Sequence, residues 1–126
     1  DGSDASRRAL ARARELGIEY RALVIVAVAA DVRSAGMGTE LAGPRPDTER
    51  LLAEARGLLD GPQGAGIETR TAVGDPAVVL NDIAREVGAQ LLIVGRSGDD
   101  FVRRTLLGSV AQRVLEHAPC DVLVVA

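Results

Sequence analysis

The run Leu91-Leu92-Ile93-Val94 leads directly into Gly95-Arg96-Ser97-Gly98, and after nine further residues the chain reads Gly108-Ser109. The apolar run predicts a buried strand, and the amphipathic stretch from Val110 to His117 predicts a helix. The glycines therefore stand where a strand ends and a helix begins. A helix N-terminus carries N–H groups without intrahelical partners and the positive end of the helix dipole, so this junction suits an anion.

Glycine and serine have specific uses at such a junction. Glycine lets the backbone approach a phosphate without a Cβ in the way, and it adopts positive φ angles readily. Ser109 can cap the helix or donate its hydroxyl to a phosphate oxygen. The chain has neither the Gly-Lys-Ser/Thr triplet of a Walker A loop nor a Gly-x-Gly-x-x-Gly dinucleotide fingerprint.

Helical and strand patterns alternate along the rest of the chain. Helices are expected over Asp4–Leu16, from a cap at Asp47 or Thr48 to Leu59, and from Pro76 to Gly88 with Asp75 as the cap; strands are expected over Leu23–Ala29, Ile67–Val73 and Val122–Val125. The valine-rich first run predicts a strand covered on both faces. Such alternation predicts one α/β domain over residues 1–126, with a doubly wound parallel sheet and helices on both faces. Ligands of such sheets bind beyond the carboxyl ends of the strands.

Composition narrows the function classes. The 126 residues are 47% hydrophobic and 26% charged, which is typical of a globular domain, while the 2% aromatic content and the net charge of −3 argue against nucleic-acid and membrane partners. The longest apolar run, Ala22–Ala30, is too short to span a bilayer, and no signal peptide is visible. The single cysteine, Cys120, cannot form an internal disulfide, which favours a reducing compartment and hence the cytoplasm.

Three stretches of the chain resemble the universal stress protein family, and the likeness extends over essentially its whole length. They are Asp1–Ser6 (Asp-Gly-Ser-Asp-Ala-Ser), Gly74-Asp75-Pro76, and the Gly-x2-Gly-x9-Gly-Ser motif with the tail His117–Val125. The motif resembles that of the nucleotide-binding branch, which implies that the chain holds ATP or another adenine nucleotide, with or without Mg²⁺. The resemblance also implies a homodimer in which Val122–Val125 pairs with its copy.

The resemblance assigns roles by position. It implies that Asp1 lies near the adenosine, that Val28 contacts the adenine through its backbone, and that Gly95 and Gly98 face the ribose and phosphates. It further implies that the phosphates are held by the N–H groups of Gly108, Ser109 and Val110.

The arginines of the loop have two interpretations. Arg96, Arg103 and Arg104 suit bidentate contacts with phosphates, but a solvated basic loop balanced by Asp99 and Asp100 fits equally well. Thr105, Leu106 and Leu107 are expected to pack beneath the loop.

The chain departs from the family pattern in two places. The family begins with a central apolar strand, which would complete a five-stranded Rossmann-like sheet, whereas this chain starts at Asp1. We expect the natural polypeptide to extend upstream, because two apolar sheet edges would otherwise be exposed. Asp121 stands where members usually carry an apolar residue or proline.

The function expected is that of a regulatory protein of the stress response, a nucleotide-dependent switch rather than an enzyme. No positioned base, catalytic lysine, carboxylate pair or metal-ligand spacing is evident in the sequence. His117 reads as a favourable cation at a helix C-terminus, Cys120 as a small buried hydrophobe, and Asp75 as a helix cap. Slow ATP hydrolysis stays open, as do a true ATPase that depends on Asp1 and a nucleotide-free dimeric interaction module.

Overall fold

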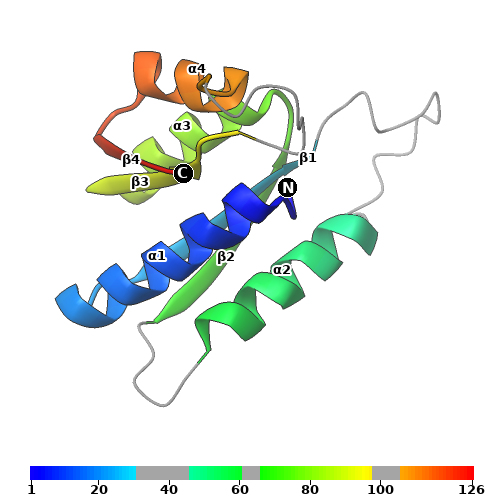
Figure 1. The fold of residues 1–126 in the computed structure, drawn as a ribbon, viewed down its shortest axis with the longest axis vertical. Helices are drawn as coiled ribbons and strands as arrows, with labels where there is room; N and C mark the ends of the chain where they lie inside the picture. Colours follow the sequence, from blue (N-terminus) through cyan, green and yellow to red (C-terminus); the bar gives the residue numbers. More distant parts are fainter. Residues whose placement is uncertain (31–45, 61–65, 98–105) are drawn as a thin grey trace.

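Helices and strands alternate along the chain, as the sequence predicts (Figure 1). The computed structural model describes residues 1–30, 46–60, 66–97 and 106–126. The elements are α1 (Asp4–Tyr20), β1 (Val24–Ala30), α2 (Pro46–Leu59), β2 (Ile67–Val73), α3 (Pro76–Val87), β3 (Leu91–Gly95), α4 (Ser109–His117) and β4 (Asp121–Val125). This is an α/β architecture.

The described strands form two parallel pairs. β1 pairs with β2 from Val24↔Ile67 to Ala30↔Val73, and β3 pairs with β4 from Leu91↔Asp121 to Gly95↔Val125. The parallel direction is confirmed. A single five-stranded sheet is not what the described residues form, because β1 and β3 are not hydrogen-bonded to each other.

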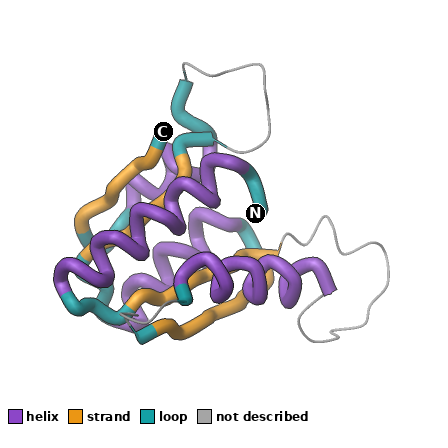
Figure 2. Tube along the Cα trace, turned by 60° about the horizontal axis from the view of Figure 1, so that its bottom comes forward, coloured by secondary structure: helices purple, strands orange, loops and turns teal. Residues whose placement is uncertain are grey.

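Two apolar clusters lie on either side of this division. One joins Val26 of β1 to Ala55 and Leu59 of α2. The other, which we call the α3–α4 core, contains Ala77, Val94, Ala111 and Val114. α1 packs against strands of both sheets, contacting β1 of one and β3 and β4 of the other, and it runs alongside α2 (Figure 2).

α2 begins at Pro46, so neither Asp47 nor Thr48 is its cap, contrary to expectation.

Two further local expectations need correction. α1 does not end before Gly17 but continues to Tyr20, with Gly17 buried inside it, and Arg21 in the left-handed region (φ 50°) closes the helix by donating its N–H to the carbonyls of Gly17 and Ile18. A single glycine costs a helix only about 1 kcal/mol relative to alanine, so tertiary packing can override it. In β1, Val26 is buried but Val24, Ile25 and Val28 are only partly buried, because the strand has one paired neighbour instead of two.

The start and end of α3 agree with the sequence. Asp75 is the N-cap, Pro76 is the first helical residue, and Gly88 closes the helix in the left-handed region (φ 61°). Across the described ranges, no helix is long and apolar enough to cross a membrane.

Candidate functional site

The glycine motif forms a junction between β3, β4 and α4, which we call the glycine junction. Gly95 ends β3, and the next residue, Arg96, donates its N–H to the carbonyl of Val125 at 2.8 Å. The Arg96 carbonyl accepts the N–H of Gly108 at 2.7 Å. The two ends of the motif are therefore brought together at the carboxyl ends of two parallel strands. Gly98 lies outside the described residues.

Both glycines are required by close packing. A Cβ on Gly95 would lie 2.8 Å from the carbonyl carbon of Ala5, and a Cβ on Gly108 would lie 2.9 Å from the carbonyl oxygen of Arg96. Backbone atoms cannot move aside as flexible side chains do, so a larger residue at either position displaces an element. Glycine is therefore needed at these positions for packing as well as for the predicted access of a phosphate. The packing requirement was not visible in the sequence.

The N-terminus of α4 is open at the junction. Gly108 is its N-cap and provides no side-chain hydrogen bond, and the first helical bond runs from the N–H of Gln112 to the Gly108 carbonyl at 2.9 Å. The N–H groups of Ser109 and Val110 precede that bond, so they have no intrahelical acceptor. Both residues are exposed. These donors, together with the helix dipole, form a site for negative charge.

Arg96 brings a cationic side chain to the glycine junction, where its backbone bonds to Val125 and Gly108. Its Nε atom is buried and has no hydrogen-bond partner among the described residues. An unsatisfied buried donor is costly, which favours a ligand oxygen as its acceptor. Arg103, Arg104 and Thr105 lie outside the described residues.

The expectation that Leu106 and Leu107 pack beneath the loop is wrong. Their side chains are 55% and 37% exposed. The bond between Gly108 and Arg96 holds the backbone that follows these leucines against the junction, while both leucines stay exposed.

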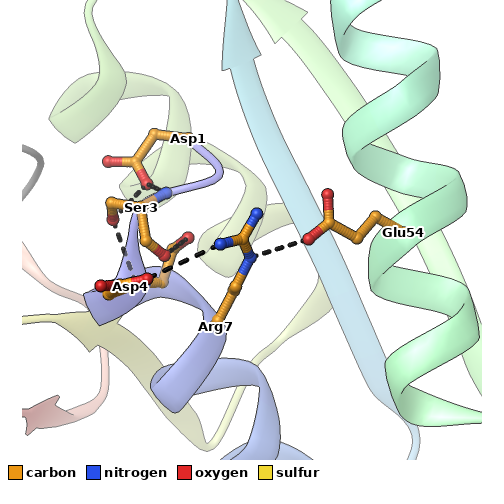
Figure 3. Close-up of polar contacts among 6 residues, drawn as sticks. Asp1, Ser3, Asp4, Arg7 and Glu54 are labelled. Carbon is orange, nitrogen blue, oxygen red and sulfur yellow. Dashed lines mark hydrogen bonds and ion pairs between the residues drawn. The ribbon is translucent and has the colours of Figure 1, made fainter.

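The first residues of the chain form a compact polar turn (Figure 3). The Asp1 Oδ1 atom accepts hydrogen bonds from the Ser3 N–H at 3.0 Å and the Ser3 hydroxyl at 2.6 Å, while Ser3 Oγ accepts the Ser6 N–H at 3.2 Å and caps α1. Gly2 occupies positive φ (79°), which turns the chain into the helix. Because Ala5 touches Gly95, this turn lies near the glycine junction.

Arg7 fastens the same turn to α2. Its Nε atom donates to Glu54 at 2.8 Å, and its Nη1 atom lies 3.6 Å from Asp4 (Figure 3). The turn that contains the predicted adenosine residue Asp1 is thus attached to α2 by an ion pair that the sequence did not reveal.

Val28 lies in the other sheet. It is two residues before the carboxyl end of β1, is paired in register with Thr71, and is partly buried. The predicted site residues therefore occupy both sheets: Asp1, Gly95, Arg96 and the start of α4 gather around the glycine junction, and Val28 lies on a strand that is not hydrogen-bonded to β3.

Residues expected to be structural have structural surroundings. His117 lies in the last turn of α4, where its Nδ1 atom is 3.2 Å from the Arg113 carbonyl. Burial, and secondarily the charge of Asp121, raises the pKa of the Cys120 thiol, which disfavours the nucleophilic thiolate. Of the residues described, no group of three or more His, Cys, Asp or Glu is arranged to hold a metal ion.

Asp75 has a second role that the sequence did not indicate. Its Oδ1 atom caps α3 by accepting the N–H groups of Ala77 (3.0 Å) and Val78 (3.3 Å), and its Oδ2 atom accepts a hydrogen bond of 2.5 Å from Arg113 of α4. The Arg113 guanidinium is the main reason that the pKa of this carboxyl lies below its usual value. The spacing of 38 residues between the partners gave no local signal.

Comparison with known proteins places this geometry in a family. The model of the universal stress protein family matches residues 1–126. A putative universal stress protein of Staphylococcus haemolyticus, SH1215, is 45% identical over 86 residues, covering 62% of this chain and 52% of the relative. SERP1273 of Staphylococcus epidermidis is 39% identical over 79 residues, covering 62% and 48%. The chain spans about half the length of the curated relatives it matches.

Solved structures of universal stress proteins resemble this chain over nearly its whole length. A universal stress protein in complex with cAMP has a TM-score of 0.76 and 35% identity, over 99% of this chain and 90% of that one. The hypothetical protein MJ0577 has a TM-score of 0.82 at 23% identity, over 99% and 90%, which shows the likeness of fold. From the family match over its whole length, this chain belongs to the universal stress protein family.

Proposed function

We propose that the protein binds an adenine nucleotide, with the phosphates at the open N-terminus of α4. The proposal is carried by two features of the same junction: the N–H groups of Ser109 and Val110 have no side-chain cap, and the buried Nε of Arg96 has no hydrogen-bond partner among the described residues. Negative charge at this point would satisfy both at once. The neighbour of 35% identity that was solved with cAMP supports an adenine nucleotide as the ligand class. ATP, with or without Mg²⁺, is the form we propose.

The adenosine end of the ligand is proposed to lie toward Asp1 and Val28. The contact between Ala5 and Gly95 supports this placement for Asp1, because it brings the first turn of α1 to the glycine junction. The position of Val28 near the carboxyl end of β1 agrees with the rule that ligands of parallel sheets bind beyond those ends.

The role we propose for the nucleotide is regulatory: binding orders the junction, and a partner or a second copy reads its state in a stress response. The residues best suited to catalysis support this over an enzyme, since His117 and Cys120 lie at the opposite end of α4 from Ser109. Slow ATP hydrolysis is the alternative that magnesium-dependent turnover would reveal.

A homodimer through Val122–Val125 and a cytoplasmic location are also proposed. Within the described sheets β4 pairs only with β3, which leaves its other edge for a copy of itself. Leu123 is outside the α3–α4 core and partly buried, so Leu123→Lys places a charge on the pairing strand, and thermal denaturation checks that the variant stays folded. Sedimentation of the wild type as a dimer and of the variant as a monomer would support the interface; a monomeric wild type would refute it.

We further propose that a fifth parallel strand joins the two sheets between β1 and β3. The partial burial of their apolar side chains and the packing of α1 on both sheets support it. Amide hydrogen exchange on the full natural polypeptide tests it: strong protection throughout β1 and β3 is expected, and fast exchange along either strand would contradict it.

The nucleotide proposal is tested first by mass spectrometry of small molecules released on denaturation, and then by titration with ATP, AMP and cAMP. Ser109→Glu places a negative charge where the phosphates would lie, yet an acidic residue in the first turn favours the helix. We expect it to weaken nucleotide binding about tenfold or more without loss of thermal stability. Gln90→Glu adds the same charge at an exposed position before β3, away from the glycine junction, and is the matched control. No released nucleotide and no binding on titration would overturn the proposal in favour of the nucleotide-free dimeric module.

A further inference from the structure

α4 needs a directional restraint if its N-terminus is to hold a phosphate. The helix has nine residues, and it packs through Ala111 (2% exposed) and Val114 (fully buried) against Ala77 and Val94 of the α3–α4 core. Apolar contact of this kind is non-directional, and these side chains are small. Polar bridges between α3 and α4 supply a directional restraint that this apolar contact lacks.

The first bridge uses both oxygens of one carboxylate. Asp75 Oδ1 is occupied by the N–H groups at the start of α3, and Oδ2 accepts Nη1 of Arg113 at 2.5 Å. Arg113 follows Ser109 by four residues, so it lies about one turn above the open end of α4. The Asp75 side chain therefore ties the start of α3 to the middle of α4, one turn from the open end.

The second bridge lies at the other end of α4. Arg85 donates from Nη2 to the His117 carbonyl at 3.1 Å and from Nη1 to Asp82 at 2.8 Å. Between the two bridges runs a groove of about 260 Å³, which both arginines line together with the buried Asn81. Two attachments at different points along α4 restrain the direction of its axis, whereas a single attachment would let the helix rotate about that point.

We propose that the Asp75–Arg113 pair is a positioning pair that aims the N–H groups of Ser109 and Val110 at the nucleotide phosphate. The inference rests on the proposed function. The side chains of the pair are about half exposed, at 50% for Arg113 and 41% for Asp75. Half-exposed ion pairs contribute little to global stability, so the effect on phosphate binding is separable from an effect on folding.

The substitutions separate the two roles of Asp75. Asp75→Asn keeps an excellent N-cap for α3 and removes the charged partner of Arg113. Arg113→Gln breaks the same bridge from α4 without touching the cap, and Arg113→Lys keeps the charge. Glu86→Gln, an exposed position of α3, makes the same charge change as Asp75→Asn and is the control.

The experiment measures dissociation constants of each variant for adenosine and for the nucleotide that the wild type binds most tightly among ATP, AMP and cAMP. Asp75→Asn and Arg113→Gln should weaken nucleotide binding roughly fivefold and leave adenosine binding within about twofold, because only the phosphate meets the helix end. Arg113→Lys should recover part of the loss, and Glu86→Gln should change neither constant.

Equal losses for adenosine and nucleotide would show a merely structural role and overturn the inference. Unchanged nucleotide binding in both bridge variants would overturn it while leaving the proposed function intact. A wild type that binds neither ligand would refute the proposed function itself, and the pair would then have no phosphate to position. Should Asp75→Asn fail to fold, Arg113→Gln carries the same test without the cap.

Discussion

The helices α3 and α4 begin in opposite ways. At α3, Pro76 removes one N–H donor and the Asp75 carboxylate accepts two more, so the end is closed by the protein itself. At α4, Gly108 brings no side-chain acceptor, and the following residues are exposed. The two helices pack against each other, yet the N-terminus of α3 is capped, whereas that of α4 has no side-chain cap among the described residues.

This difference separates structural from functional helix ends. α1 begins like α3, because Ser3 Oγ accepts the N–H of Ser6. Orphan N–H groups at a helix start are satisfied by caps, water or ligands. Where the chain provides a side-chain cap the end is structural, and where it provides glycine bonded to the backbone of an arginine the end is suited to a ligand.

The largest effect is expected when the open end is filled. Gly108→Val places a Cβ 2.9 Å from the Arg96 carbonyl oxygen, so it should lower the free energy of unfolding by about 1–3 kcal/mol and abolish nucleotide binding. Chemical denaturation and titration measure the two effects. Gly57→Ala in α2 is the control, since nothing lies within 4 Å of its added Cβ and alanine favours the helix. Full nucleotide affinity in Gly108→Val would contradict the site.

The next effect concerns the closed end. Asp75→Ala removes the cap of α3 and the partner of Arg113, and it should lower the melting temperature by roughly 3–5 °C, whereas Asp75→Asn should keep most of the stability. Calorimetry of both variants without ligand is the measurement. A similar loss in the two variants would show that the charge, and not the cap, stabilises this end.

A smaller effect is expected at the cationic side chain of the glycine junction. Arg96→Gln should weaken nucleotide binding roughly fivefold, because a charge-assisted contact is lost, while thermal stability stays unchanged. The buried Nε has no partner to lose among the described residues. If the variant binds nucleotide as tightly as the wild type, Arg96 belongs to the solvated basic loop that the sequence left open.

The smallest effect is expected in the pH dependence of the free energy of unfolding at acidic pH. The hydrogen bond from Arg113 lowers the pKa of Asp75 below its value of 3.8 in the unfolded chain. The ionised carboxylate therefore stabilises the folded state above pH 3.8, and this contribution is lost as the pH falls through the lower, folded-state pKa. The stability difference between wild type and Asp75→Asn should stay constant from about pH 5 to 8 and shrink below about pH 4. A difference that varied near neutral pH would point to another group.

Much of the fold could be predicted from local signals. The strand Ile67–Val73, the Asp75 cap and Gly88 as the end of α3 follow from periodicity, capping chemistry and glycine conformation. The expectation that Ser109 caps α4 is wrong, because Gly108 is the N-cap and Ser109 is the first helical residue. Gly17 misled because a buried glycine can sit inside a helix. The sheet division could not be predicted, since strand pairing depends on which chain segments meet in space.

In the candidate site, too, the features that are local in sequence could be predicted and the long-range contacts could not. The motif spacing located Gly95, Gly108 and the open helix end, because those features are consecutive in the chain. The Ala5–Gly95 contact and the Asp75–Arg113 bridge join residues far apart in sequence, and no local pattern encodes them.

The most direct test is nuclear magnetic resonance of the backbone amides during titration with ATP. The account predicts large, saturable shifts at Ser109 and Val110, whose N–H groups are open, and small shifts at Ala77 and Val78, whose N–H groups already bond to Asp75. Equal shifts at both helix ends, or none at Ser109 and Val110 at saturating ATP, would contradict it.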